Sequence, residues 1–203
     1  MNIAIIGTGY VGLVTGACFA EFGVQVVCAD KDEAKIAALE RGEIPIYEPG
    51  LEAIVQRNLR ERRLTFTTDS AAAIRQSLVV FIAVQTPTGP EGSTDLSAVE
   101  AVAREIGRSI DGYKVVVTKS TVPVGTSYKV RAWVEEEMAA AGLHHRFSVA
   151  SNPEFLREGA AIGDFMRPDR VVIGADDERA EAVLKRLYRP LYLIETPVLA
   201  ISI

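Results

Sequence analysis

A glycine turn between two apolar runs determines the fold of the first thirty residues. The run from Ile3 to Ile6 leads into residues 7–12, which read GTGYVG, and an amphipathic stretch then leads to a second run from Gln25 to Ala29 that ends at Asp30. This order is typical of a strand, a tight turn, a helix and a parallel second strand with an acid at its end. It predicts a site for a dinucleotide.

Each glycine of the turn has its own physical task. Gly7 permits the tight turn out of the strand, Gly9 leaves room for a pyrophosphate beside the backbone, and Gly12 lets the helix pack closely on the sheet. Tyr10 and Val11 stand where the helix begins, and the free N–H groups of its first turn face the phosphates. We therefore expect Gly7, Gly9, Tyr10, Val11 and Gly12 to bind the cofactor.

Asp30 predicts which dinucleotide binds. A carboxylate at this place accepts hydrogen bonds from the adenosine ribose hydroxyls and repels a 2′-phosphate, so the sequence favours NAD over NADP. Lys31 and Lys35 oppose this selection in part, because a nearby cation tolerates the additional phosphate.

Apolar runs bounded by turn residues recur along the whole chain. The predicted strands are Ile3–Ile6, Gln25–Ala29, Leu64–Thr67, Leu78–Ala83, Lys114–Thr118, Phe147–Ala150 and Val171–Ile173. The predicted later helices are Asp32–Arg41, Leu51–Glu61, Leu96–Ile110, Thr126–Ala141 and Glu178–Tyr188. This alternation predicts an α/β fold, a doubly wound and mostly parallel Rossmann-type sheet with helices on both faces. Ligands then bind at the carboxyl ends of the strands.

Composition excludes several other classes of function. The chain has 203 residues, 48% of them hydrophobic, with a formal net charge of −5 and no clustered basic face, so we expect no nucleic acid and no membrane among its partners. The two cysteines, Cys18 and Cys28, are expected to be small buried residues in a reducing, cytoplasmic setting. His144 and His145 lack a carboxylate or cysteine cluster, so we expect no metal site.

Three loops follow predicted strands and are candidates for the site. Thr86 and Thr121 place hydroxyls there, although each could instead cap the following helix. Lys119 could contact a phosphate or simply stand at a solvated strand end. Glu154 and Glu158 would share one face if their segment were helical, and a solvated helix start is the alternative for both.

Five motifs, in order, carry a resemblance to a known family. They are GTGYVG, PIYEPGL (residues 45–51), TPTG (86–89), KSTVPVGT (119–126) and NPEFLREG (152–159). From residue 1 to about 200 the chain resembles the nucleotide-sugar 6-dehydrogenases of the UDP-glucose/GDP-mannose dehydrogenase family. The resemblance implies that the C6 alcohol of UDP-glucose is oxidised to an aldehyde and then to the carboxylate of UDP-glucuronate. Two NAD are reduced and one water is consumed.

The resemblance also implies residue roles. Residues at the adenosine and pyrophosphate site would be Gly7, Gly9, Gly12, Asp30 and Lys35, and those beside the ribose and nicotinamide would be Thr86, Thr121 and Glu158. Glu154 would handle protons and the hydrolysis of a covalent thioester, with Thr121 helping to hold the water. The substrate loop would comprise Glu154, Phe155, Leu156 and Arg157.

The family's nucleophilic cysteine has no counterpart in this chain. The resemblance places it in a second nucleotide-binding domain, reached through a long linking helix that would also form the dimer of the full enzyme. We therefore expect residues 1–203 to be one NAD-binding domain that is inactive alone, with the linking helix and the substrate domain absent. The last residues, Ile201 to Ile203, depart from the family pattern.

Two alternatives stay open at this point. The substrate could be another nucleotide sugar, GDP-mannose or a UDP-N-acetylhexosamine, because such relatives share the cofactor motifs. The chain could also be a non-catalytic NAD sensor whose binding changes its association with a partner protein.

Overall fold

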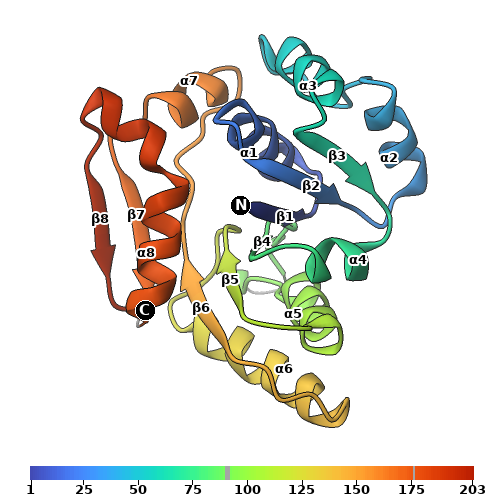
Figure 1. Cartoon of the computed structure of the whole chain (residues 1–203), viewed down its shortest axis with the longest axis vertical. Coiled ribbons are helices and arrows are strands. Elements are labelled where there is room, and N and C mark those ends of the chain that lie inside the picture. The colour runs from blue at the N-terminus through green and yellow to red at the C-terminus, as the bar shows by residue number, and fades with distance from the viewer. Residues whose placement is uncertain (90–91, 176) are drawn as a thin grey trace.

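One sheet of eight strands organises the computed structural model, which describes residues 1–89, 92–175 and 177–203 (Figure 1). The strands are β1 (Asn2–Ile6), β2 (Gln25–Ala29), β3 (Leu64–Thr67), β4 (Val79–Ile82), β5 (Lys114–Thr118), β6 (Phe147–Ser151), β7 (Val171–Ala175) and β8 (Val198–Ile201). Their order across the sheet is β3-β2-β1-β4-β5-β6-β7-β8. Neighbours are parallel except for β6 and β7, which pair antiparallel. The mostly parallel, doubly wound sheet is confirmed.

Helices cover both faces of this sheet. They are α1 (Tyr10–Glu21), α2 (Glu33–Glu40), α3 (Leu51–Arg60), α4 (Ser70–Arg75), α5 (Ser97–Ser109), α6 (Thr126–Ala140), α7 (Ala161–Met166), α8 (Glu178–Leu187) and the 3-10 helix η2 (Arg189–Ile194). Along β1, Ile3 and Ile5 pack in the core beneath α1, α3, α7 and α8, whereas Ala4 and Ile6 pack against α4, α5 and α6. Because both faces of the central strands are buried, their sequences are apolar without alternation.

Four features differ from the sequence prediction. Helix α1 is not amphipathic, because α3 and α7 cover the side that would otherwise face water, and residues 12–20 are all buried. The sequence predicted a mostly parallel sheet without identifying the exception, which is the antiparallel pairing of β7 with β6. The tail forms β8, parallel to β7 at the edge of the sheet. Helices α4 and α7, with six residues each, are too short to show a periodic pattern.

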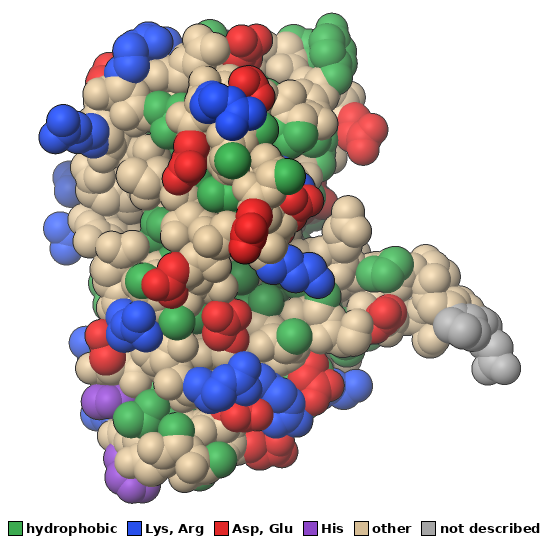
Figure 2. Space-filling view, turned by 90° about the vertical axis from the view of Figure 1, so that its right-hand side faces the viewer, with side chains coloured by type: hydrophobic (Ala, Val, Ile, Leu, Met, Phe, Trp, Pro, Cys, Tyr) green, Lys and Arg blue, Asp and Glu red, His purple; other side chains and the backbone are tan. Residues whose placement is uncertain are grey.

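Most charged side chains lie on the surface, and Glu48, Lys114 and Lys119 are buried exceptions. On the face drawn in Figure 2, basic and acidic groups are interspersed rather than gathered in one patch of a single sign. None of the helices within the described residues is long and apolar enough to cross a bilayer.

Candidate functional site

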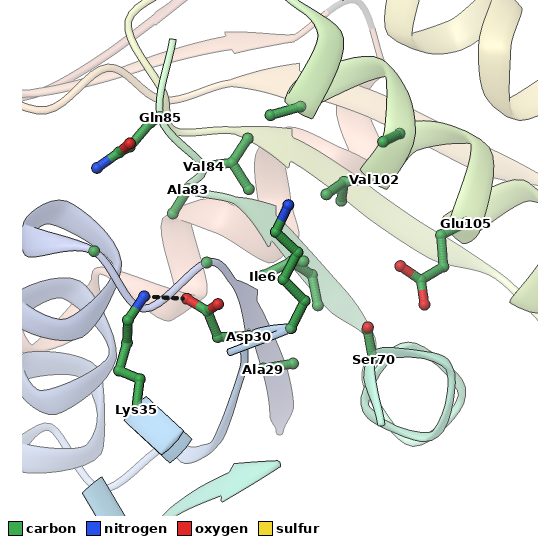
Figure 3. A pocket seen from close by; sticks show the side chains of 15 residues that line it. Ile6, Ala29, Asp30, Lys35, Ser70, Ala83, Val84, Gln85, Val102 and Glu105 are labelled. Atoms are coloured by element: carbon green, nitrogen blue, oxygen red, sulfur yellow. Dashed lines mark hydrogen bonds and ion pairs between the residues drawn. The ribbon is translucent and has the colours of Figure 1, made fainter. Parts of the chain in front are cut away.

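A cleft of about 360 Å³ opens at the carboxyl ends of β1, β2 and β4, and we call it the Asp30 cleft. Its lining includes Gly7, Gly9, Asp30, Lys35, Val84 and Val102. Figure 3 shows Asp30 and Lys35 on one side of the cleft, with Glu105 and Ser70 across from them. The contribution of α5 could not be predicted from the sequence, because the residues of that helix that line the cleft belong to no motif.

Asp30 is held by three donors on one of its oxygens. Its Oδ2 accepts the backbone N–H of Thr8 at 2.9 Å, the Thr8 hydroxyl at 2.7 Å and Nζ of Lys35 at 3.1 Å. Oδ1 accepts the N–H of Asp32 at 3.1 Å, and a carboxylate oxygen has room for a second donor. Burial acts to raise the pKa of Asp30, but these hydrogen bonds outweigh it and lower the pKa to about 2. The carboxylate is therefore ionised and oriented at neutral pH.

The three glycines of the turn differ in their surroundings. Gly7 has φ +106°, and a Cβ there would lie 2.6 Å from the carbonyl oxygen of Ala83. A Cβ at Gly12 would lie 1.9 Å from the carbonyl oxygen of Gly7, so only glycine allows α1 to begin so close to the turn. A Cβ at Gly9 would meet nothing in the described chain within 4 Å. This empty space lies at the N-terminus of α1, which has no side-chain cap, and such a place suits a phosphate group.

A second cavity of about 210 Å³ adjoins the first, and we call it the Thr121 cavity. It shares Gly9, Ala83, Val84 and Gln85 with the Asp30 cleft and adds Thr86, Lys119, Ser120, Thr121 and Glu154 among others. The hydroxyl of Thr86 donates to the carbonyl oxygen of Thr121 at 2.8 Å. The alternative that these threonines cap helices is wrong, because the N-caps of α5 and α6 are Leu96 and Gly125.

A solvated strand end, one of the two alternatives for Lys119, is wrong, because the residue is only 4% exposed. Its Nζ donates to Oδ1 of Asn152 at 3.1 Å and lies 3.5 Å from the hydroxyl of Tyr188. Burial lowers the pKa of Lys119 to about 8, and the nearby Glu154 carboxylate acts in the opposite direction. The burial of Lys119 could not be predicted from its motif, because it involves Tyr188, which is 69 positions away in the sequence.

The loop that contains Glu154 and Glu158 is not helical, so their spacing does not place them on one face. Glu154 lies in the Thr121 cavity, where its Oε2 accepts the backbone N–H of Leu156 at 2.6 Å. Arg157 binds Asp164 of α7 through two nitrogens, at 3.1 and 2.7 Å. Phe155 is half exposed, with the guanidinium of Arg170 at 4.9 Å from its ring centre.

Glu158 lines a third and more open cavity of about 770 Å³, which we call the Glu158 cavity. The same cavity is lined by Gly9, Tyr10 and Lys35. Thus the structure brings Thr86, Thr121 and Glu154 together, and separately brings Glu158 to the glycine turn and Tyr10.

Glu48 of the PIYEPGL motif is a residue for which sequence reasoning found no role. It is 7% exposed and joins Tyr10 to the loop that follows Glu154. The only indication in the sequence was that this carboxylate stands among mostly apolar residues in the PIYEPGL motif.

The two cysteines lie in the buried core and not in the cavities. Cys18 and Cys28 are fully buried and unpaired, and burial is the main cause that raises the pKa of each thiol to about 12. Within residues 1–89, 92–175 and 177–203, no group of three or more histidine, cysteine or acidic side chains is placed to hold a metal ion.

Comparison with known proteins shows the family of the chain. Residues 1–192 match the model of the UDP-glucose/GDP-mannose dehydrogenase family, NAD binding domain. The chain belongs to this family. Its cofactor is therefore NAD, as Asp30 predicts.

Individual members of the UDP-glucose/GDP-mannose dehydrogenase family are similar over nearly the whole chain. UDP-glucose 6-dehydrogenase of Rhizobium meliloti (strain 1021) is 56% identical over 201 residues, which are 98% of this chain and 45% of that protein. The structure of a UDP-glucose dehydrogenase from Pyrobaculum islandicum superposes with a TM-score of 0.93 at 45% identity, over 99% of this chain and 46% of the other. GDP-mannose dehydrogenase from Pseudomonas aeruginosa superposes with a TM-score of 0.92 at 38% identity, over 100% of this chain and 46% of the other. The chain thus spans about half the length of these relatives.

Proposed function

We propose that this chain is the NAD-binding half of an enzyme that oxidises UDP-glucose to UDP-glucuronate in two NAD-dependent steps. The observation that carries the proposal is the row of adjoining cavities from Asp30, past the glycine turn, to Thr121 and Glu154. A dinucleotide requires such an elongated site, with polar groups for the reaction at the end away from the adenosine.

The residues of the row fit NAD in chemistry and in order. Asp30 offers Oδ1 to a ribose hydroxyl, and the N-terminus of α1 at Gly9 suits the pyrophosphate. Gly7 and Gly12 allow the backbone to approach the pyrophosphate closely. Tyr10 and Val11 line the Thr121 cavity. Lys35 forms an ion pair with Asp30 and neutralises part of the negative charge at the site. When bound, NAD supplies the acceptor for the hydride that leaves the alcohol carbon.

Glu154 and Thr121 are the proposed catalytic residues. Oxidation of an alcohol releases a proton, and hydrolysis of an acyl intermediate needs a positioned water. The Glu154 carboxylate lies in the same cavity as Thr121, and the N–H of Leu156 fixes one of its oxygens. Glu154 would take up the proton, and the threonine would help to hold the water. Phe155, Leu156 and Arg157 would form the wall on the substrate side.

Similarity favours UDP-glucose over other nucleotide sugars. The Rhizobium meliloti protein, named for UDP-glucose, is 56% identical to this chain. The GDP-mannose dehydrogenase of Pseudomonas aeruginosa is 38% identical, and the UDP-D-ManNAc dehydrogenase of Pyrococcus horikoshii is 29% identical.

The nucleophile and the dimer contacts would lie outside residues 1–203. Both cysteines of the chain are buried with raised pKa values, so neither is available to form a thioester. We accordingly assign residues 1–203 to one NAD-binding domain, and the linking helix, the substrate domain and the homodimer contacts to the rest of a full-length enzyme.

A titration and a chimera test the proposal. Calorimetry of the purified chain should show binding of NAD and much weaker binding of NADP, and Asp30→Ala should abolish the NAD signal. The chain alone should form no NADH from UDP-glucose. Joined to the C-terminal half of the Rhizobium meliloti relative, it should form NADH from UDP-glucose faster than from GDP-mannose. A folded chimera that binds NAD without turnover would favour the sensor alternative.

A further inference from the structure

Three distant segments of the chain meet at the carboxylate of Glu48. Its Oε2 accepts the hydroxyl of Tyr10 and the backbone N–H of Gly159, the latter at 2.8 Å. Its Oε1 lies 3.4 Å from the N–H of Ile162 at the start of α7. Glu48 therefore joins the glycine turn to the loop that carries Glu154.

The partners of Glu48 are all neutral donors. In the described part of the chain, no lysine or arginine forms an ion pair with it. A buried carboxylate is unfavourable unless donors surround it, so its charge fixes where the Tyr10 hydroxyl and the Gly159 N–H must lie. Burial, followed by the hydrogen bond to Glu48, raises the pKa of Tyr10 to about 12, so Tyr10 remains a donor at neutral pH.

Both ends of this connection line the cofactor cavities. Tyr10 is the first residue of α1, directly after Gly9, and it lines both the Thr121 cavity and the Glu158 cavity. Gly159 lines the Glu158 cavity from the other side, and its N–H also lies 3.2 Å from the Tyr10 hydroxyl. A ligand that orders the start of α1 therefore also orders Tyr10. Because the Glu48 carboxylate accepts hydrogen bonds from both Tyr10 and Gly159, ordering Tyr10 also orders Gly159.

We propose that Glu48 is a positioning residue that couples dinucleotide binding at the glycine turn to the ordering of residues 154–159. The inference rests on the proposed function, because it requires NAD at the turn. Coupling between two sites is reciprocal, so an ordered loop also strengthens NAD binding. The loop that contains Glu154 is thus set in place for the reaction when the cofactor is bound.

Hydrogen exchange of the Gly159 amide, followed by NMR on the chain of 203 residues, tests the coupling. Exchange is measured with and without saturating NAD in the wild type, in Glu48→Gln, in Tyr10→Phe and in the control Glu52→Gln, which changes an exposed carboxylate on α3. We expect NAD to slow exchange in the wild type and the control. In Glu48→Gln and Tyr10→Phe this slowing should shrink about tenfold, the factor for losing one hydrogen bond to a charged group.

The ratio of the two exchange rates separates coupling from mere stabilisation. A purely structural Glu48 would speed exchange equally with and without NAD, and an unchanged ratio in the variants would overturn the inference alone. Absence of NAD binding by the wild type would overturn the proposed function and the inference with it. Tyr10→Phe retains the ring, so it decides the matter if Glu48→Gln does not fold.

Discussion

Thr8 donates both its backbone N–H and its hydroxyl to a single oxygen of Asp30, at 2.9 and 2.7 Å. The acid that we propose to select NAD is thus held by a residue of the glycine turn itself. Because Oδ2 is occupied by Thr8 and Lys35, the oxygen with room for a ribose hydroxyl is Oδ1. The turn and the acid act as one unit, although 22 positions separate Thr8 from Asp30.

Thr8→Val should weaken NAD binding by about tenfold, because it removes one of the hydrogen bonds that orient the charged Asp30 carboxylate. Thr8→Ser retains the hydroxyl and serves as the matched control. Calorimetric titration of both variants with NAD measures the effect. Equal dissociation constants for Thr8→Val and wild type would show that the hydroxyl does not orient the acid.

Stability should fall in acid as Asp30 is protonated. Its pKa in the fold, about 2, lies below the ordinary value of 3.8, so its contribution is present above pH 4 and is lost as the pH falls toward 2. That contribution is roughly 2 kcal/mol. In urea unfolding, Asp30→Asn should be less stable than wild type at pH 7, and the two should converge toward pH 2. A difference independent of pH would mean that the ionised carboxylate is not the cause.

Substituting alanine at two glycines of the turn should affect different properties, the stability of the fold at Gly12 and NAD binding at Gly9. Gly12→Ala places a Cβ 1.9 Å from a backbone oxygen, and such overpacking should destabilise the fold by about 3 kcal/mol or more. Gly9→Ala meets nothing within 4 Å, at φ −70°, so it should fold within about 1 kcal/mol of wild type. Its methyl group occupies the space proposed for the pyrophosphate, so NAD binding should be lost. Thermal unfolding and titration distinguish the two, and NAD binding by a folded Gly9→Ala would contradict this use of the space.

Much of the fold follows from apolar runs, because a strand buried on both faces is apolar throughout. The predicted bounds of β2, β3 and β5 agree with the structure. The direction of β7 could not be predicted, since a strand's own residues do not say which neighbour it pairs with. Strand β8 is an edge strand of four residues that are not fully buried, so it lacks the pattern of the central strands.

The geometry of the candidate site was predictable where one short segment forms it, as at Gly7, Gly12 and Asp30. It was not predictable where the task depends on long-range contacts. Glu48 acquires its role only when Gly159, 111 positions away, approaches it. Glu154 and Glu158 are four positions apart, and this spacing places them on one face only in a helix. The loop that the structure shows directs them into different cavities.

Lys119→Met should stabilise the protein at neutral pH. The lysine is 4% exposed and its pKa is lowered to about 8, so below that pH the fold contains a buried cation. Methionine removes the charge, and the hydrogen bond from Tyr188 to Asn152 at 2.5 Å can remain. We expect the free energy of unfolding to increase by about 1–3 kcal/mol at pH 7.

The stabilising effect of Lys119→Met should also depend on pH. Between pH 8 and 10.5 the folded protein loses the Lys119 proton before the unfolded chain does, so wild-type stability rises with pH and the advantage of the variant shrinks. Denaturant unfolding from pH 7 to 10, with the exposed Lys129→Met as control, tests this, and a destabilised variant with an unchanged pH profile would refute it.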